Sequence, residues 1–461
     1  MIALAALLLA APIDIGSRLE LFVDDFLIES LEGVRLVLHP PRPAGKAIAF
    51  DQPWEGNTSA YVTVFKDDDR YRMYYRGSAE SSYIPRSAVR PGGPLPGAHP
   101  EFACYAESRD GIAWTKPSLG LVEFDGSKQN NIIWGEKSIS HNFAPFRDRN
   151  PAAPPAERYK ALAGGRSAGG LVAFRSADGI HWSRMREKPV LADGAFDSLN
   201  VAFWDSPRGL YVAIYRDFRH GVRTIKFATS KDFLNWSAGE WADFGAAPLE
   251  HLYTNATSPY FRAPHIFLAF PKRFVPWRTV HEDASSPGIS ETVFMASRDG
   301  LHWRRRLEAF IRPGRDERDW IHRNNMVAAG VVPTAADELS LYCSRHYNYP
   351  TAYLERMTLR TDGFISAQAG FAGGELRTKP LTFEASSLVL NYATSAAGSL
   401  QVELEDVHGN PLPGLALADQ KPLFGDRIEH ALKIDKRLSG IPVRLRFVLK
   451  DADLYSFQFR P

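Results

Sequence analysis

The chain has 461 residues, with 55 Lys and Arg against 53 Asp and Glu, and its formal net charge is +2 at pH 7. Such a balanced charge excludes bulk electrostatic attraction to nucleic acid or to membrane surfaces, so we expect no nucleic-acid partner. Aromatic residues make up 12% of the chain, beside 35 Gly and 32 Pro, a mixture typical of turn-rich β proteins. The length suffices for one large domain with a sizeable core and a smaller second domain.

The N-terminus, MIALAALLLAAP, is apolar from Ile2 to Ala11. This run has the length of the hydrophobic part of a secretory signal and is too short to cross a bilayer. We therefore expect residues 1–18 to be an export signal with a short lead-in. The protein is then expected to be secreted or periplasmic and to have no membrane span. The alternative is an N-terminus that stays on the protein as a disordered tail.

The chain has two cysteines, Cys104 and Cys343. They allow neither a zinc-binding spacing nor a disulfide framework, and free cysteines are usually buried. The sequence also lacks the common nucleotide-binding and metalloprotease motifs. We expect no metal and no cofactor.

A short turn signature recurs along the chain, with the pattern S-x-D-G-x-x-W. It begins at Ser108 (SRDGIAW), Ser176 (SADGIHW) and Ser297 (SRDGLHW), and SKDFLNW from Ser230 keeps the frame without the Gly. A fifth copy, RTDGFIS, is marked by Asp362 and lacks the Trp. Alternating strand-like segments precede each copy, and units of 50 to 70 residues suit the blades of a β-propeller.

We therefore predict an all-β protein with a five-bladed β-propeller over residues 19–372. The segment LELFVDDFLIES, residues 19–30, is expected to lend a strand to the last blade and so close the ring. After residue 372 alternating strands continue without the turn signature, which predicts a non-catalytic β-sandwich over residues 373–461.

The repeated turn itself is expected to be structural. Its Asp can bond nearby backbone, its Gly can adopt the left-handed conformation, and its Trp can pack beside the next blade.

The five units, the recurring turns and the appended sandwich together resemble the five-bladed propeller glycosidases. The architecture is similar to that of glycoside hydrolase family 32, and family 43 is a relative without the obligatory sandwich. The family 32 motifs Trp-Met-Asn-Asp-Pro-Asn-Gly, Arg-Asp-Pro and Glu-Cys are absent, and FRDRNP (Phe146 to Pro151) matches the second only superficially. The resemblance implies a glycoside hydrolase acting on a furanoside or a related polysaccharide-derived glycan, with an oligo- or polysaccharide as substrate.

In a propeller, the starts of the first strands and the ends of the second strands of all blades meet at one end of the central axis. Glycoside hydrolysis needs two carboxyl groups at the scissile bond, and carboxylates occur at the expected first-strand starts of blades one, three, four and five. We expect Glu55, Asp197 and Glu250 to supply the catalytic pair and a helper. Which of them is the acid, and whether the reaction retains or inverts, stays open.

Amide, imidazole and aromatic side chains accompany these carboxylates, and such groups bind sugar hydroxyls and ring faces. The residues expected to bind substrate are Asp25, Trp54, Asn57, His141, Asn142, Asn200, Tyr253, Arg216, Arg323, Asn324 and His346. Asp25 is included because the N-terminal strand was expected to pass near the axis. Ordinary hydrogen-bonding or surface roles are the alternative for each of them.

Basic residues recur at the expected ends of the second strands, among them Arg76, Arg216, Lys272 and Arg345. A local cationic rim suits an anionic sugar, sulfated or uronic, which arginines bind in bidentate fashion. Pairing with nearby carboxylates is the alternative. Two other functions stay open: a glycoside phosphorylase that holds phosphate on this rim, and a non-catalytic carbohydrate-binding propeller.

Overall fold

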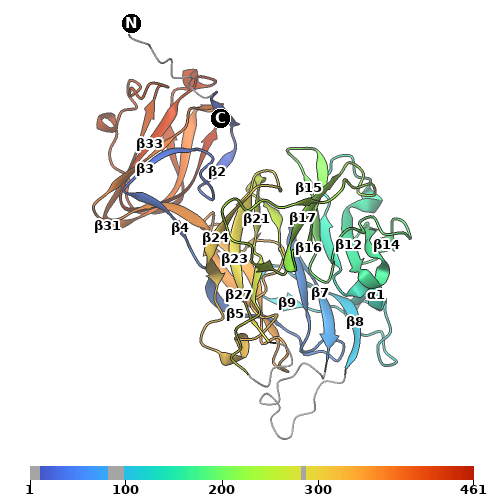
Figure 1. Cartoon of the computed structure of the whole chain (residues 1–461). Coiled ribbons are helices and arrows are strands. Elements are labelled where there is room, and N and C mark those ends of the chain that lie inside the picture. The colour runs from blue at the N-terminus through green and yellow to red at the C-terminus, as the bar shows by residue number, and fades with distance from the viewer. Residues whose placement is uncertain (1–10, 81–97, 282–286) are drawn as a thin grey trace. The chain divides into compact units, whose positions relative to one another are not determined.

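The computed structural model describes residues 11–80, 98–281 and 287–461. Its chain forms two compact units, one of residues 40–359 and one that combines the described residues up to His39 with residues 360–461 (Figure 1). Nearly all regular structure is β. The described helical segments are α1 (Lys137–Ser140) and single 3₁₀ turns at Pro155–Glu157, Arg166–Ala168, Glu317–Asp319, Leu417–Asp419 and Lys436–Leu438.

No helix in the described ranges is long and apolar enough to cross a membrane. The apolar run on which the export signal was predicted falls almost entirely within residues 1–10, outside the described residues.

Residues 40–359 form the predicted five-bladed propeller, with one antiparallel sheet in each blade. Blade 1 contains β6 (Ala60–Asp67), β7 (Arg70–Ala79), β8 (His99–Ser108), β9 (Trp114–Thr115) and β10 (Ile132–Trp134). Blade 2 contains β11 (Ala144–Arg147), β12 (Tyr159–Gly165), β13 (Gly170–Ser176) and β14 (Ser183–Arg184). Blade 3 contains β15 (Val201–Asp205), β16 (Leu210–Arg219), β17 (Val222–Ser230) and β18 (Glu240–Trp241).

The last two blades depart from this simple order. Blade 4 contains β19 (His251–Leu252), β20 (Ser258–Tyr260), β21 (Ala263–Ala269), β22 (Lys272–Val275), β23 (Ile289–Ser297) and β24 (Trp303–Ile311). Blade 5 contains β25 (Val332–Pro333), β26 (Glu338–Arg345), β27 (Tyr353–Arg360) and, from the start of the chain, β5 (Arg42–Ala49).

The ring is closed by β5, which pairs antiparallel with β27 so that Ala49 lies opposite Tyr353. An N-terminal strand therefore closes the propeller, but the prediction that residues 19–30 supply it is wrong. The expected segment belongs to the other unit, because its apolar residues Leu19, Leu21 and Phe22 are buried there. The closing strand has exposed residues from Arg42 to Lys46, so it gives only a weak strand pattern.

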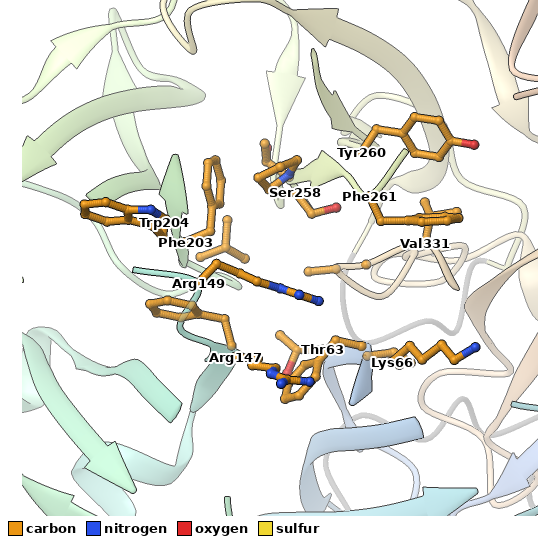
Figure 2. A pocket seen from close by; sticks show the side chains of 18 of the residues that line it. Thr63, Lys66, Arg147, Arg149, Phe203, Trp204, Ser258, Tyr260, Phe261 and Val331 are labelled. Carbon is orange, nitrogen blue, oxygen red and sulfur yellow. The ribbon is translucent and has the colours of Figure 1, made fainter. Parts of the chain in front are cut away.

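The innermost strands surround a cavity of about 640 Å³ at the end of the propeller axis where these strands finish (Figure 2). Its walls come from β6, β11, β15, β20 and the stretch Ala329 to Pro333, so all five blades contribute.

The second unit is built from both ends of the described chain. Its strands are β1 (Ile13–Gly16), β2 (Leu19–Leu21), β3 (Ile28–Glu32), β4 (Val34–Leu38), β28 (Ile365–Ala369), β29 (Gly374–Thr378), β30 (Leu381–Phe383), β31 (Ser387–Glu405), β32 (Asp426–Lys433) and β33 (Arg444–Arg460). Strands β1 and β30 pair in parallel, and the other eight form one sheet network.

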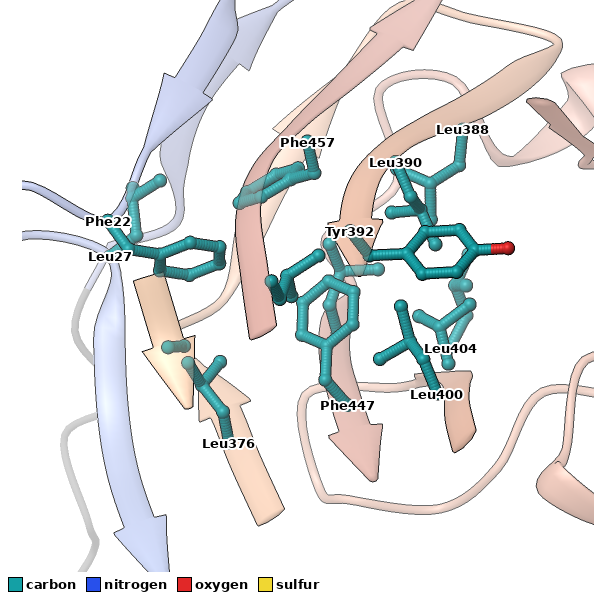
Figure 3. Packing of buried hydrophobic residues seen from close by; sticks show 14 of the residues in the cluster. Phe22, Leu27, Leu376, Leu388, Leu390, Tyr392, Leu400, Leu404, Phe447 and Phe457 are labelled. Atoms are coloured by element: carbon teal, nitrogen blue, oxygen red, sulfur yellow. The ribbon is translucent and has the colours of Figure 1, made fainter. Parts of the chain in front are cut away.

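The core of this unit joins N-terminal and C-terminal residues. Phe22 and Leu27 pack in one cluster with Leu376, Phe447 and Phe457 (Figure 3). Residues 19–39 and 360–372, expected in the propeller, thus pair with the C-terminal strands instead. The β-sandwich expected for residues 373–461 stays a prediction.

The recurring turn has the geometry expected from its sequence. In the second copy Gly179 N donates to Ser176 Oγ over 2.9 Å, and His181 N donates to Asp178 Oδ1 over 2.8 Å. Gly179 has φ +79°, and Tyr74 of blade 1 donates to its carbonyl oxygen. The turn therefore links its blade to the preceding one, which is a structural role.

Candidate functional site

Each blade places one functional side chain at or just before the start of its innermost strand. These residues are Tyr61, His141, Asp197, Tyr253 and Arg323, from blades 1 to 5 in turn. The sequence predicted this position for the site, and the structure joins four of the five directly, because Tyr61, His141 and Tyr253 each hydrogen-bond Asp197. Arg323 acts on Asp197 through its charge. We call these five residues the axial cluster.

Asp197 is the centre of the axial cluster. Its Oδ1 accepts from His141 Nε2 at 2.9 Å and from the Tyr61 hydroxyl at 3.3 Å, and its Oδ2 accepts from the Tyr253 hydroxyl at 3.2 Å. The side chain is still 55% exposed, whereas Tyr61 and Tyr253 are buried. Solvent therefore reaches this carboxylate although three side chains hold it in place.

The charge of Asp197 is fixed by its surroundings. Burial opposes ionisation, but the hydrogen bond and charge of His141, with the charges of Arg216 and Arg323, outweigh it and hold the pKa of Asp197 well below its usual range. Arg216 Nη2 lies 3.9 Å from Asp197 Oδ2. The carboxylate is therefore an anion at neutral pH in the free protein.

His141 lies between two carboxylates. Its Nδ1 is 2.9 Å from Glu101 Oε1, while its Nε2 bonds Asp197. Burial would lower the pKa of His141, but these two hydrogen bonds outweigh it and raise the pKa above the usual value. Both ring nitrogens carry protons at pH values below this raised pKa, and the pair of His141 and Asp197 then holds a proton that can be transferred.

Basic side chains at the ends of the second strands surround the axial cluster. Arg76 on β7 is buried, donates to Glu101 over 3.2 Å, and lies 4.6 Å from the centre of the Tyr61 ring. Arg216 on β16 lies 4.9 Å and Lys272 on β22 lies 3.9 Å from the centre of the Tyr253 ring. Three of the cations predicted for this end of the propeller, Arg76, Arg216 and Lys272, therefore lie beside the axial cluster, whereas Arg345 pairs with Glu355 over 2.8 Å.

Three nitrogen atoms near Tyr253 are buried without a hydrogen-bond partner among the described residues: Arg223 Nε, Lys272 Nζ and His322 Nδ1. Burial and the charge of Arg323 lower the pKa of Lys272 well below its usual value. Burial, Lys272 and Arg323 lower the pKa of His322 to about 2. Buried polar groups normally have partners, so three unpartnered nitrogens in one place are a site prepared for an anion or for ordered water.

The other two predicted catalytic carboxylates lie elsewhere. Glu55 is buried in blade 1, where it accepts from Tyr75 at 2.5 Å and from Lys116 at 2.6 Å; burial raises its pKa above the usual value. Glu250 pairs with Arg273 at 3.4 Å and with Arg305 at 3.0 Å. Neither shares a hydrogen-bond partner with Asp197 in the described structure, so these contacts do not connect the three carboxylates.

Several predicted substrate-binding residues have structural partners. Each buried asparagine donates its side-chain amide to backbone carbonyl oxygens, which fixes the loops at this end of the blades. The amide contacts run from Asn57 to Glu80, Asn142 to Phe196 and Ser198, Asn200 to Phe196 and Ser198, and Asn324 to Arg318. Their placement does not support contact with a substrate.

The remaining predicted residues are also outside the axial cluster. Trp54 donates to Asn131 within blade 1, and His346 bonds Thr351 and Asp316 beside blade 5. Asp25 lies in the second unit, because the strands on either side of it, β2 and β3, pair there. Of the predicted residues, His141, Asp197, Arg216, Tyr253 and Arg323 are the ones brought together.

Sequence reasoning missed Tyr61, Glu101 and Arg223. Tyr61 lies inside an apolar strand pattern and has φ +55°, which turns its side chain in a way that alternation does not predict. Glu101 on β8 and Arg223 on β17 belong to third strands, whereas the predicted site positions were starts of first strands and ends of second strands. No group of three or more His, Cys, Asp or Glu residues in the described chain is arranged to hold a metal ion.

No protein-family model and no curated protein matches this chain. Solved structures similar to it include one titled a glycoside hydrolase, with a TM-score of 0.48 and 14% identity over 70% of this chain and 92% of that one. A glycoside hydrolase family 43 arabinoxylan arabinofuranohydrolase from Bacillus subtilis has a TM-score of 0.43 and 13% identity, over 89% and 96% of the two chains. A β-1,2-mannobiose phosphorylase from Listeria innocua has a TM-score of 0.42 and 10% identity, over 68% and 96%. Structures similar to this chain thus include glycoside hydrolases, as the sequence predicted, and the function has to be inferred from the side chains at the axis.

Proposed function

We propose that the protein is a glycan-active enzyme, a glycoside hydrolase that cleaves an anionic, polysaccharide-derived glycan such as a sulfated or uronic furanoside. The observation that carries this proposal is the state of Asp197. It is an ionised carboxylate that solvent reaches, held by two buried tyrosine hydroxyls and by the His141 imidazole where the five blades meet.

The substrate anion is matched to the cations around Tyr253. Arg216, Arg223 and Arg323 outnumber the Asp197 carboxylate there, and three unpartnered nitrogens are available to a sulfate or carboxylate. A planar guanidinium suits these anions because it donates two parallel hydrogen bonds. A bound anion also offsets the positive charge that keeps Asp197 ionised, which raises its pKa toward that of a proton donor.

In this proposal the pair of His141 and Asp197 donates the proton to the leaving glycosidic oxygen, and a water molecule attacks the anomeric carbon. General acid catalysis of this kind contributes about 10² to 10⁴ in rate. Glu101 contacts the other side of the imidazole and keeps it charged and oriented. It acts through His141 and is a positioning residue.

One observation favours a second function on the same site, a glycoside phosphorylase. The unpartnered nitrogens of Arg223 and Lys272 lie beside Tyr253, whose hydroxyl contacts Asp197, so a phosphate ion bound there would be near that carboxylate. A phosphate ion held by Arg223 and Lys272 could replace both the second carboxylate and the attacking water.

We also propose that the second unit folds as the predicted β-sandwich and takes no part in the chemistry. Its long strands β31 and β33 lose register between Thr394 and Ser399, where one strand can bend from one layer into the other. Its buried side chains are mainly aliphatic and aromatic.

The test is an assay on oligosaccharides in sulfated or uronic form and in the matching desulfated or carboxyl-reduced form. We expect new reducing ends from the anionic form only, in phosphate-free buffer, and no turnover by Asp197→Asn. Turnover that requires phosphate would refute the hydrolase and support the phosphorylase. Equal turnover of the neutral form would refute the anionic substrate, and binding without turnover would leave a non-catalytic carbohydrate-binding protein.

A further inference from the structure

We propose that the cavity at the other end of the propeller axis is a second binding site, which takes a small amphipathic organic anion with an apolar body and one carboxylate or sulfonate group. This cavity is lined by later parts of the innermost strands, such as Thr63 to Lys66 on β6 and Val201 to Trp204 on β15. The axial cluster precedes those segments, and none of its residues lines the cavity. The inference therefore does not depend on the activity proposed for Asp197.

Two hydroxyl groups inside the cavity point to an occupant. Thr63 and Thr257 both line it, are 4% and 1% exposed, and have side-chain oxygens without a hydrogen-bond partner in the described structure. A buried hydroxyl without a partner destabilises the folded protein. Two of them in one cavity, from blades 1 and 4, indicate that a ligand or ordered water completes their bonding.

The walls determine what the body of that ligand can be. Phe146, Phe203, Tyr260 and Val331 line the cavity from four different blades. Figure 2 shows Phe203 and Val331 on its two sides. A volume of 640 Å³ is in the range of pockets that hold a small organic molecule. A sugar would leave most of its hydroxyls against these apolar walls, so an aromatic or aliphatic body fits better.

The rim determines the charge of the ligand. Lys66 and Arg149 line the cavity, are exposed, and form no ion pair with any described residue. The other charged residues of the rim are already paired, since Arg147 lies 2.6 Å from Asp68 and Asp68 also pairs with Arg158. Figure 2 shows the Arg149 side chain extending between the walls. Two free cations above an apolar chamber are complementary to one anionic head group.

The experiment titrates the full chain with 8-anilinonaphthalene-1-sulfonate, an aromatic sulfonate whose fluorescence reports apolar surroundings. N-phenyl-1-naphthylamine, which has the same rings without the sulfonate, is the matched neutral probe. We expect one saturable site for the sulfonate. Its Kd should rise about tenfold in Lys66→Met/Arg149→Met, because each cation contributes a charge-assisted contact. The Kd of the neutral probe should stay within a factor of two.

Two further variants make the result specific. Val331→Trp adds bulk to the cavity wall and should weaken both probes, whereas Arg166→Met removes an exposed cation that is not part of the cavity lining and should change neither. Unchanged thermal unfolding of each variant shows that it folds. The proposal is overturned if the double variant binds the sulfonate as tightly as the parent. It is equally overturned if Arg223→Met, at the Asp197 end, is the substitution that abolishes binding.

Discussion

His141 Nε2 lies 2.9 Å from Asp197 Oδ1, so the imidazole from blade 2 holds the carboxylate of blade 3. The opposite ring nitrogen contacts Glu101 of blade 1 at 2.9 Å. Three blades are thus joined through one ring, and the proton on Nε2 is shared with the carboxylate that solvent reaches. This relationship makes the position and the charge of Asp197 depend on His141, and it leads to the first two predictions.

Replacing Asp197 by Asn should lower kcat on the anionic oligosaccharide by about 10²- to 10⁴-fold, because the amide keeps the shape but cannot exchange a proton. Initial rates at saturating substrate measure this. Glu250→Gln is the matched control, since Glu250 pairs with Arg273 and Arg305 away from the axial cluster, and it should keep kcat within a factor of two. A larger loss of kcat in Glu250→Gln than in Asp197→Asn would assign the main catalytic role to Glu250.

The pH dependence of stability should identify the protonated imidazole. The pKa of His141 is raised in the folded protein, so its stabilising contribution is complete below the unfolded pKa of about 6.5 and is lost as pH rises through the folded value. The parent should therefore have a higher unfolding midpoint than His141→Gln. This difference should be largest near pH 6 and should decrease toward alkaline pH. Denaturant unfolding at several pH values measures it, with the exposed His408→Gln as control. A difference that increases as the pH rises would show that His141 is neutral in the folded state.

The propeller could be predicted because a repeated turn is a local signal. The bonds from Ser176 Oγ and Asp178 Oδ1 to nearby backbone are made within seven residues, so the sequence pattern contains the whole motif. The closing strand could not be predicted, since β5 depends on pairing with β27 about 300 residues away and has few apolar residues of its own.

Part of the axial cluster could also be predicted, because the position of a residue along a blade is visible in the sequence. Position along a blade selected Asp197, His141 and Tyr253, which the structure brings into contact, because first strands start at the axis in every blade. It also selected Glu55, because position alone does not show that Lys116 and Tyr75 bury that carboxylate within blade 1. The partners of a side chain depend on tertiary packing, and the spacing of residues in one sequence does not predict them.

Lys272→Met should raise stability while weakening substrate binding. The Lys272 amine is fully buried and has no hydrogen-bond partner in the described structure, and an apolar side chain of similar length removes the cost of burying it. Because the folded pKa is lowered, Lys272 reduces stability below its unfolded pKa of about 10.4, and the penalty grows as pH falls toward the folded value. The gain in Tm should therefore be larger at pH 6 than at pH 10, while KM for the anionic substrate rises. A lower Tm at both pH values would mean that the amine has a structural partner.

The ion pair of Glu55 with Lys116 should matter for stability and not directly for chemistry. Lys116→Met leaves the Glu55 carboxylate buried without its cation, which costs about 3 kcal/mol. The double variant Lys116→Met/Glu55→Gln removes both charges and should recover most of that loss. Urea unfolding of the three proteins measures the free energies, and kcat per folded molecule should be similar in all of them. A kcat loss in the double variant comparable to that of Asp197→Asn would place Glu55 in the reaction.

Gly330 is required where the innermost strands of blades 5 and 1 touch. Ala329 N donates to Val62 O and Val64 N donates to Ala329 O, each over 2.8 Å. Gly330 has φ +113°, and a Cβ there would overlap the Val64 carbonyl oxygen. Gly330→Ala should therefore force the two strands apart and cost about 3 kcal/mol. Gly209→Ala is the matched control: Gly209 has φ +66° with open space around its Cβ position, so only backbone strain of about 1 kcal/mol is expected. Urea unfolding measures both variants. Equal destabilisation would show that the strands of blades 5 and 1 can move apart at Gly330 without a loss of stability.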